Sequence, residues 1–175
     1  MLAIVSDLSA QAPVQNFSLT NVVDGSTVSL DNYLSVVVIF TSNTCPFDRY
    51  YRDRINALIR SHGLRTPFIL INSCPQEDES PEMMKTAYAA WNQNVPYLAD
   101  KEQVAMNLFA ARKTPQVFVL NSKHVVVYSG AIDDNAQVAN AVEESYLKDA
   151  LDELSASQPV AIPATRPVGC SIRKK

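Results

Sequence analysis

The segment VVVIFTSNTCPFDRYYRDRI, residues 36–55, combines an apolar run, a short polar loop and a cysteine directly before a proline. The β-branched and aromatic run at 36–40 is typical of a strand covered on both faces. From Pro46 onward the apolar residues take helical spacing, and proline suits a first helical turn, where its missing N–H would have been unpaired. The segment therefore predicts a central strand that leads through a loop into a helix, with Cys45 at the helix N-terminus.

The predicted helix ends near His62-Gly63, because glycine is the usual residue just past a helix end. A second buried strand is expected at 68–72, so strand, helix and strand form a right-handed crossover with parallel strands. The helix should be amphipathic. Its inward residues are predicted to be Tyr50, Ile55, Leu58 and Ile59, and its outward residues Asp48, Arg49, Arg52, Asp53 and Arg54.

The remaining elements follow from turn chemistry and periodicity. Two short strands within 13–31 are predicted to join at Asp24-Gly25, and a late hairpin is predicted to pair 116–120 with 125–129. Helices are predicted from a Ser80 cap to about Asn92, at 101–111, and at 138–155 with Val138, Val142, Tyr146, Ala150, Leu151 and Leu154 inward. The order predicts an α/β layer sandwich with a mixed sheet and helices on both faces.

The composition is that of one globular domain, residues 1–175, with an extended proline-rich tail at 157–175. The net charge is −3, which provides no basic field for nucleic acid, and the terminal Arg173, Lys174 and Lys175 are expected to be solvated. The N-terminus has no basic leader and no apolar run of the length that a signal peptide or a membrane helix needs. These features predict a cytoplasmic location and no membrane partner, and they leave the oligomeric state open.

The three cysteines, at 45, 74 and 170, are odd in number and far apart, which argues against a disulfide scaffold and a paired zinc site. No metal or cofactor is expected. A helix N-terminus lowers the pKa of a cysteine from about 8.5, and Arg49 can add a nearby cation. Ser42, three residues before Cys45, can hydrogen-bond the thiolate or orient an incoming oxygen. The competing interpretation is that Cys45 is only a small buried residue at a strand end.

Other polar residues have simpler interpretations. The acidic run of Glu77, Asp78, Glu79 and Glu82 is expected to be a solvated loop near the mouth of the site. Asp133-Asp134-Asn135 is expected to be a solvated turn or helix cap and not a metal site. His62 and His124 have neither a carboxylate nor a cysteine at motif spacing, and Trp91 is expected in the core. Thr114-Pro115 precedes a buried strand, and the sequence leaves its peptide isomer open.

Several segments together resemble a thioredoxin-fold redoxin of the AhpC/TSA superfamily, most closely its peroxiredoxin-like group of uncharacterised thiol–disulfide oxidoreductases. The matching segments include APVQNFSL, VVVIFTSNTCPFDRYYRDRI, LINSCPQEDESPEMMK, VPYLADKEQVAMNLFAARKTPQVFVL and TRPVGCSIRK, and they span nearly the whole chain. The resemblance implies a three-layer sandwich with an N-terminal strand pair, a redox cysteine at Cys45, and a cis-proline facing it at Pro115 after Thr114.

The chain departs from this family pattern in its cysteine loop. The group often has Cys-Asn-His-Cys-Pro where this chain has Ser42-Asn43-Thr44-Cys45-Pro46, so a two-thiol exchange within the loop is excluded. The remaining pattern resembles the Thr-x-x-Cys of peroxiredoxins, although Val38 stands where those proteins usually carry a proline. Arg49 and Arg112 are the candidates for an activating arginine.

The resemblance leaves the roles of the other two cysteines open. Cys170 matches a tail motif of the group, and it either resolves an oxidised Cys45 as a disulfide or packs after a glycine turn. Cys74 lies on the same sheet edge as Cys45, and it is either incidental or a replacement for the lost partner. A disulfide there requires Cα atoms within about 7 Å.

Two functions remain open at this stage. The first is a thiol-dependent oxidoreductase whose Cys45 is oxidised by a peroxide or a protein disulfide and restored by a thioredoxin-like thiol donor. Ser42 and Thr44 would then position the substrate oxygen, and Thr114 and Pro115 would shape the facing wall. The second is a redoxin-fold binding or regulatory protein without catalysis, which the loss of the first loop cysteine permits.

Overall fold

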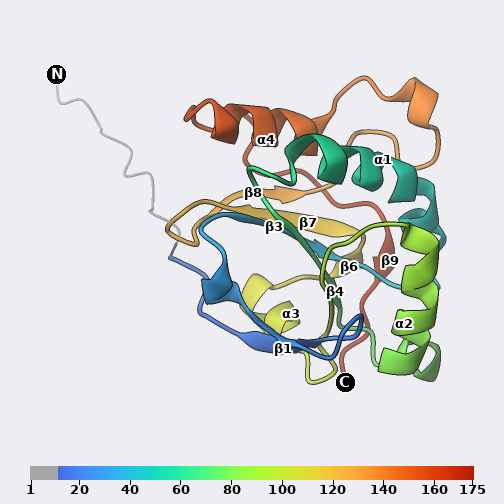
Figure 1. The fold of residues 1–175 in the computed structure, drawn as a ribbon. Helices are drawn as coiled ribbons and strands as arrows, with labels where there is room; N and C mark the ends of the chain where they lie inside the picture. Colours follow the sequence, from blue (N-terminus) through green and yellow to red (C-terminus); the bar gives the residue numbers. More distant parts are fainter. Residues whose placement is uncertain (1–11) are drawn as a thin grey trace, which may run out of the picture.

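The computed structural model describes residues 12–175 (Figure 1). Residues 1–11, on which the predictions of a missing leader and of the first part of the domain rest, lie outside the described residues. Across 12–175 no helix has both the length and the apolar character needed to cross a membrane. Strands and helices alternate around a mixed sheet, so the predicted α/β sandwich is confirmed.

The main sheet has seven strands, and a further pair forms a small sheet beside it. The strands are β1 (Ser18–Asn21), β2 (Thr27–Ser29), β3 (Val36–Phe40), β4 (Phe68–Asn72), β5 (Tyr97–Ala99), β6 (Lys113–Thr114), β7 (Gln116–Leu120), β8 (Val126–Gly130) and β9 (Cys170–Ser171). The main sheet has the order β2-β1-β5-β4-β3-β7-β8, with β3, β4 and β5 parallel. The predicted central strand β3 is buried along its whole length, and both predicted hairpins form.

The sequence did not predict strand β5. This strand has three residues and follows Pro96, so it is too short to show a period of its own. It lies between β1 and β4, and it joins the N-terminal hairpin to the parallel strands through pairs such as Asn21 with Leu98. The strand pair at the N-terminus is therefore part of the main sheet.

The helices are α1 (Pro46–His62), α2 (Pro81–Tyr88), α3 (Val104–Phe109) and α4 (Tyr146–Ser155). The start and end of α1 are those predicted, with Cys45 as its N-cap and Gly63 directly after it. The Ser80 cap of α2 is also confirmed, because the Ser80 hydroxyl accepts a hydrogen bond from the Met83 amide. α2 and α3 are shorter than predicted, and a 3-10 turn, Ala89–Trp91, continues α2 toward Asn92.

The predicted faces of α1 are wrong near its N-terminus. Tyr50 is half exposed, and the neighbouring Tyr51 is buried against the core instead. Asp48, which was expected to face solvent, is also fully buried. Ile55 is buried as predicted, but Arg54, which was expected to face solvent, pairs with Asp133 and has only 18% of its side chain exposed.

The start predicted for the last helix is wrong, because residues 138–145 do not join α4. The side chain of Asn135 accepts a hydrogen bond from the Val138 amide at 2.8 Å, and that of Asp134 accepts one from the Glu143 amide at 3.1 Å. Short polar side chains that bind backbone amides in this way compete with helix formation. Val138 is consequently 53% exposed, although Ala150 and Leu151 pack inward as expected.

The sequence predicted that the turn Asp133-Asp134-Asn135 is solvated or caps a helix, but the first of these residues is not solvated. Asp133 is buried, and its carboxylate pairs with the Arg54 guanidinium of α1 at 2.5 Å. Among residues 12–175 no cluster of three or more histidine, cysteine or acidic side chains is placed to hold a metal ion. The Arg54–Asp133 ion pair holds this loop against α1.

Helices α1 and α4 lie together on one face of the sheet and α3 lies on the other (Figure 1). Side chains of α1, α2 and α4 share the first hydrophobic core, which includes Trp91 as predicted. Side chains of α3 share the second core with Ile172 from the C-terminal tail. The tail is extended as predicted, but Ile172 shows that its end is packed into the fold.

Candidate active site

The loop between β3 and α1 places Cys45 at the helix N-terminus. Pro46 begins the helix, and the Cys45 amide donates a hydrogen bond to the Ser42 hydroxyl at 3.3 Å. The N-terminus of a helix presents unpaired N–H groups and a partial positive charge, which stabilise an anion. Cys45 is 2% exposed, so any reaction at its sulfur requires an opening beside it.

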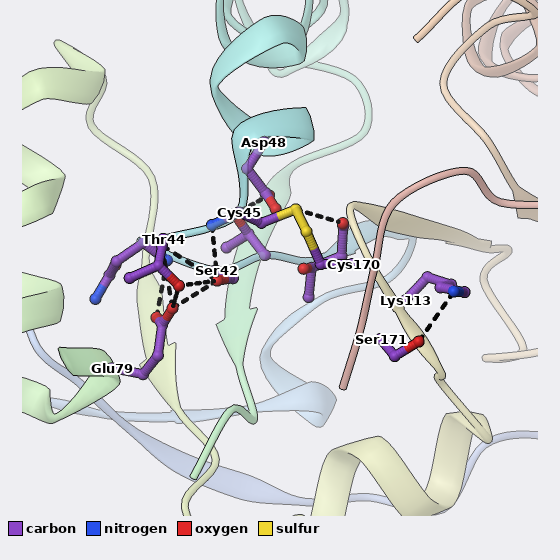
Figure 2. The surroundings of a disulfide bond; sticks show 11 residues. Ser42, Thr44, Cys45, Asp48, Glu79, Lys113, Cys170 and Ser171 are labelled. Atoms are coloured by element: carbon purple, nitrogen blue, oxygen red, sulfur yellow. Dashed lines mark hydrogen bonds between the residues drawn. A yellow bond between two sulfur atoms is a disulfide. The ribbon is translucent and has the colours of Figure 1, made fainter. Parts of the chain in front are cut away.

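The sulfur of Cys45 is bonded to Cys170 (Figure 2). The two cysteines are 125 residues apart in the sequence, and their Cα atoms lie 6.0 Å apart, within the usual range for a disulfide. The bond exists because β9 pairs with β6 in antiparallel register, which sets Cys170 opposite Thr114. Of the two candidate partners that the sequence offered, the structure brings Cys170 to Cys45.

Thr114 and Pro115 form the wall that faces Cys45. The Cys45 sulfur lies 3.3 Å from the Thr114 carbonyl oxygen, and the Thr114–Pro115 peptide bond is cis. Both residues are buried. The predicted position of this pair beside the cysteine is therefore present in the structure.

A buried carboxylate organises the loop before Cys45. Glu79 is 1% exposed, although the sequence placed it in a solvated acidic run. Its carboxylate accepts hydrogen bonds from the Ser42 hydroxyl at 2.5 Å, the Asn43 amide at 2.8 Å, the Thr44 amide and hydroxyl at 3.1 and 2.7 Å, and the Asn72 side chain at 2.7 Å. Burial raises the pKa of Glu79, but these hydrogen bonds outweigh it and hold the pKa below its ordinary value.

Within this network the hydroxyls of Ser42 and Thr44 bind a carboxylate of the protein itself. Both hydroxyls point toward Glu79 (Figure 2), and both donate their hydrogen to it. A substrate oxygen would have to replace the carboxylate to receive those hydrogen bonds. The prediction that Ser42 and Thr44 orient a substrate oxygen stays a prediction, while their contribution to the shape of the loop is direct.

A second buried acid lies in the first turn of α1. The Asp48 carboxylate accepts a hydrogen bond from the Thr41 hydroxyl through Oδ1, and Oδ2 has no partner. Burial raises the pKa of Asp48 to about 8, against an ordinary value of 3.8, and the hydrogen bond from Thr41 only partly offsets it. Asp48 is therefore mainly protonated near neutral pH, and it places little negative charge beside Cys45.

Asp48→Asn is expected to stabilise the protein increasingly as the pH rises from about 4 to 8. Below this window Asp48 is protonated in both states. Within it the unfolded chain ionises while the folded chain keeps its proton, so the wild-type free energy of unfolding falls with pH. The gain at pH 8 should be on the order of 5 kcal/mol. Urea unfolding across this range measures it.

Asp53→Asn is the matched control for this experiment, because Asp53 is exposed on the same helix. It should leave the pH dependence of the wild type unchanged. If the Asp48→Asn and wild-type curves run parallel between pH 4 and 8, Asp48 is not the group that titrates.

Cys74 is the free cysteine among the described residues and is buried. Burial raises the pKa of its thiol to about 12, with a further contribution from the charge of Glu79. At neutral pH this thiol is almost entirely protonated and thus a poor nucleophile. Cys74 is near the disulfide, but its environment suits packing.

One pocket, of about 370 Å³, opens onto the disulfide. Ser42, Thr44, Glu79 and Thr114 line it together with Cys74 and both bonded cysteines. Arg173 also lines it, and this residue is exposed, as the sequence predicted for the basic end of the tail. Arg49 and Arg112, the two predicted activating cations, are exposed and do not line the pocket. The position of Arg173, three residues after Cys170, was the only signal that could have found it.

The sheet, the flanking helices and the cysteine at the start of α1 together define a thioredoxin-like fold. An uncharacterised conserved protein from Geobacillus kaustophilus has a TM-score of 0.87 to the chain at 29% identity, covering 95% of this chain and 92% of its own. A hypothetical protein from Sinorhizobium meliloti 1021 has a TM-score of 0.84 at 23% identity, covering 96% of each chain. No protein-family model matches the chain, and no curated protein matches its sequence.

A third similar structure carries a thioredoxin name. The pneumococcal exposed lipoprotein thioredoxin of Streptococcus pneumoniae has a TM-score of 0.60 at 19% identity, and the match covers 70% of this chain and 93% of the other. At this identity the likeness concerns the fold alone. The function of the present chain must be argued from its own cysteines.

Proposed function

We propose that this protein is a thiol–disulfide oxidoreductase that uses Cys45 as its nucleophile and Cys170 as its second redox cysteine. The observation that carries the proposal is the Cys45–Cys170 disulfide, which joins a helix N-terminus to a distant tail. In the reduced protein the Cys45 thiolate attacks one sulfur of a substrate disulfide and forms a mixed disulfide with it, while the other substrate sulfur leaves as a thiolate and takes up a proton. The Cys170 thiolate then attacks the Cys45 sulfur, releases the substrate as a thiol, and closes the internal disulfide. Two electrons pass from the protein to the substrate.

The surroundings of Cys45 support this assignment. The N-terminus of α1, a helix of 17 residues, favours the thiolate that both attacks and leaves during exchange. Asp48 is mainly protonated near neutral pH, so the acid in the first turn of α1 adds little negative charge beside that thiolate, and the ionised carboxylate of the pocket is that of Glu79. Cys74 lacks such support, because burial keeps its thiol protonated. The loop before α1 contains one cysteine, Cys45, and the tail supplies the second, Cys170.

A protein disulfide fits this site better than a peroxide. The hydroxyls of Ser42 and Thr44 already donate to Glu79, and neither Arg49 nor Arg112 lines the pocket. Peroxide reduction, the activity that the AhpC/TSA resemblance suggests, is favoured by hydrogen-bond donors that are free to bind the oxygen on which negative charge develops. A thioredoxin-like thiol donor in the cytoplasm is the proposed source of electrons.

The assignment is tested by mapping the three cysteines. The reduced protein is treated with one equivalent of an aromatic disulfide or of hydrogen peroxide, the remaining thiols are alkylated, and the peptides are identified by mass. We expect a Cys45–Cys170 link to form faster with the disulfide, while Cys74 is alkylated only after denaturation. Equal reactivity at all three cysteines would contradict the proposal.

The same experiment separates catalysis from the alternative of a binding or regulatory protein. With a dithiol donor in excess, and after subtraction of the rate at which the donor alone reduces the aromatic disulfide, an oxidoreductase reduces many equivalents of this substrate. A protein without catalysis consumes no more than one. Cys74→Ser serves as the control, and it should turn over at the wild-type rate.

A further inference from the structure

The C-terminal strand occupies the backbone edge beside Cys45. β6 and β9 form a two-stranded sheet of their own, in which Thr114 pairs with Cys170 and Lys113 pairs with Ser171. A chain that pairs with β6 in this register brings a cysteine at position 170 onto the Cys45 sulfur. Backbone pairing with β6 therefore determines which residue of an extended segment lies against the Cys45 sulfur (Figure 2).

The residue before Cys170 approaches this edge most closely. A Cβ atom at Gly169 would overlap the Thr114 carbonyl group and lie 3.1 Å from the Pro115 nitrogen. Both neighbours are backbone atoms of buried residues, and they cannot move as the end of a flexible side chain can. The edge accepts only glycine at the position before the cysteine.

The structure also restricts the side chain two positions after Cys170, at Ile172. Ile172 is 8% exposed and belongs to the second hydrophobic core, and its amide donates to the Arg112 carbonyl oxygen at 2.9 Å. A charged side chain there would lose its hydration on entering the core. Position 172 therefore requires an apolar residue.

The structure places little restriction on the side chain at position 171, between Cys170 and Ile172. Ser171 is exposed, and its hydroxyl accepts a hydrogen bond from the exposed Lys113 ammonium group at 3.0 Å. Further along, the Gln103 side chain donates to the carbonyl oxygen of Arg173, a backbone contact that any residue can make. The edge thus selects at two positions around the cysteine and tolerates variation at the others.

We propose that the β6 edge is a binding site for an extended segment of a partner protein with the sequence Gly-Cys-x-apolar, and that residues 169–172 are the chain's own copy of that segment. The inference rests on the proposed function and names its substrate class. When the tail is released, the partner segment pairs with β6 and its disulfide-bonded cysteine meets the Cys45 thiolate. The S–S bond to the partner's other cysteine breaks, and that sulfur leaves as a thiolate and takes up a proton.

The tail and the partner cannot occupy β6 at the same time. When the tail returns to this edge, Cys170 comes back onto Cys45, the mixed disulfide breaks, and the partner cysteine leaves as a thiolate. Closure of the internal disulfide and release of the product are then one event. This arrangement explains why the second redox cysteine lies on a strand and not in the loop of Cys45.

The proposal is tested with peptides on the full chain carrying Cys74→Ser and Cys170→Ser, which leave Cys45 as its thiol. Three peptides carry residues 167–174, PVGCSIRK, with the cysteine linked to a coloured aromatic thiol as a mixed disulfide. One has the natural sequence, one has alanine in place of glycine, and one has aspartate in place of isoleucine. We expect the natural peptide to react at least about tenfold faster than either altered one. Three rates within about twofold of one another overturn the inference.

A symmetric aromatic disulfide separates failure of the inference from failure of the proposed function. If Cys45 reacts with this small reagent but does not discriminate among the peptides, only the inference fails. If Cys45 reacts with none of the reagents, both fail. Within the otherwise natural chain, Gly169→Ala should slow closure of the Cys45–Cys170 disulfide, while Val168→Ala, at a position 46% exposed, should not.

Discussion

Cys45→Ser will lose at least about 1,000-fold of the rate at which the protein reduces an aromatic disulfide in the presence of a dithiol donor. A serine hydroxyl is protonated at neutral pH and does not attack sulfur, so the first step of the exchange has no nucleophile. Cys74 cannot take over, because burial raises the pKa of its thiol to about 12. The rate is followed from the coloured thiol that the substrate releases.

Two further variants complete this experiment. Cys74→Ser should keep the rate within about twofold of the wild type, since the buried thiol takes no part. In the absence of the dithiol donor, the reduced Cys170→Ser variant should release one equivalent of coloured thiol and stop at the mixed disulfide, which mass spectrometry detects at Cys45. A Cys45→Ser variant that keeps a tenth or more of the wild-type rate would show that another residue is the nucleophile.

Glu79→Ala will cost at least about 3 kcal/mol of the free energy of unfolding. The substitution leaves Ser42, the Asn43 amide, Thr44 and Asn72 without the oxygen atoms to which they donate. Buried donors without an acceptor lose their hydration and gain nothing in return. Urea unfolding of the oxidised protein at neutral pH measures the loss, and Glu77→Ala, an exposed neighbour, should change it by less than about 0.5 kcal/mol.

The pH dependence of this effect has a definite sign. The pKa of Glu79 is lower in the folded protein than its ordinary value of 4.5, so ionisation stabilises the fold above that value. The contribution is lost as the pH falls through the folded pKa. The stability difference between wild type and Glu79→Gln should therefore shrink below about pH 4.5. A difference that stays constant down to the acid transition would show that Glu79 acts only as a neutral acceptor.

The local elements of the fold could be predicted because each depends on residues close in the sequence. The apolar run at 36–40 specified β3, Pro46 and Gly63 bounded α1, and Ser80 capped α2. Predictions failed where groups outside the element itself decided the outcome. β5 is stable only between β1 and β4, and the start of α4 depends on side chains from the turn before it.

Some features of the site could likewise be predicted from the sequence, and others could not. Cys45 at a helix N-terminus and Thr114-Pro115 beside it were predicted from motif spacing and from family resemblance. The buried states of Glu79 and Asp48 were not, because a charged side chain in a polar stretch normally faces water. Only the donors that meet Glu79 from the Cys45 loop and from Asn72 compensate for its burial.

The sequence alone determined that a strand, a polar loop and a helix place one cysteine where its thiolate is stabilised, since these features depend on neighbouring residues and backbone geometry. The tertiary structure alone decided which cysteine is bonded to it. Cys74 is closer in the chain, but Cys170, 125 residues away, reaches the sulfur because β9 pairs with β6. Sequence distance says little about such a contact, because strand pairing is specified by the edge that the folded chain presents.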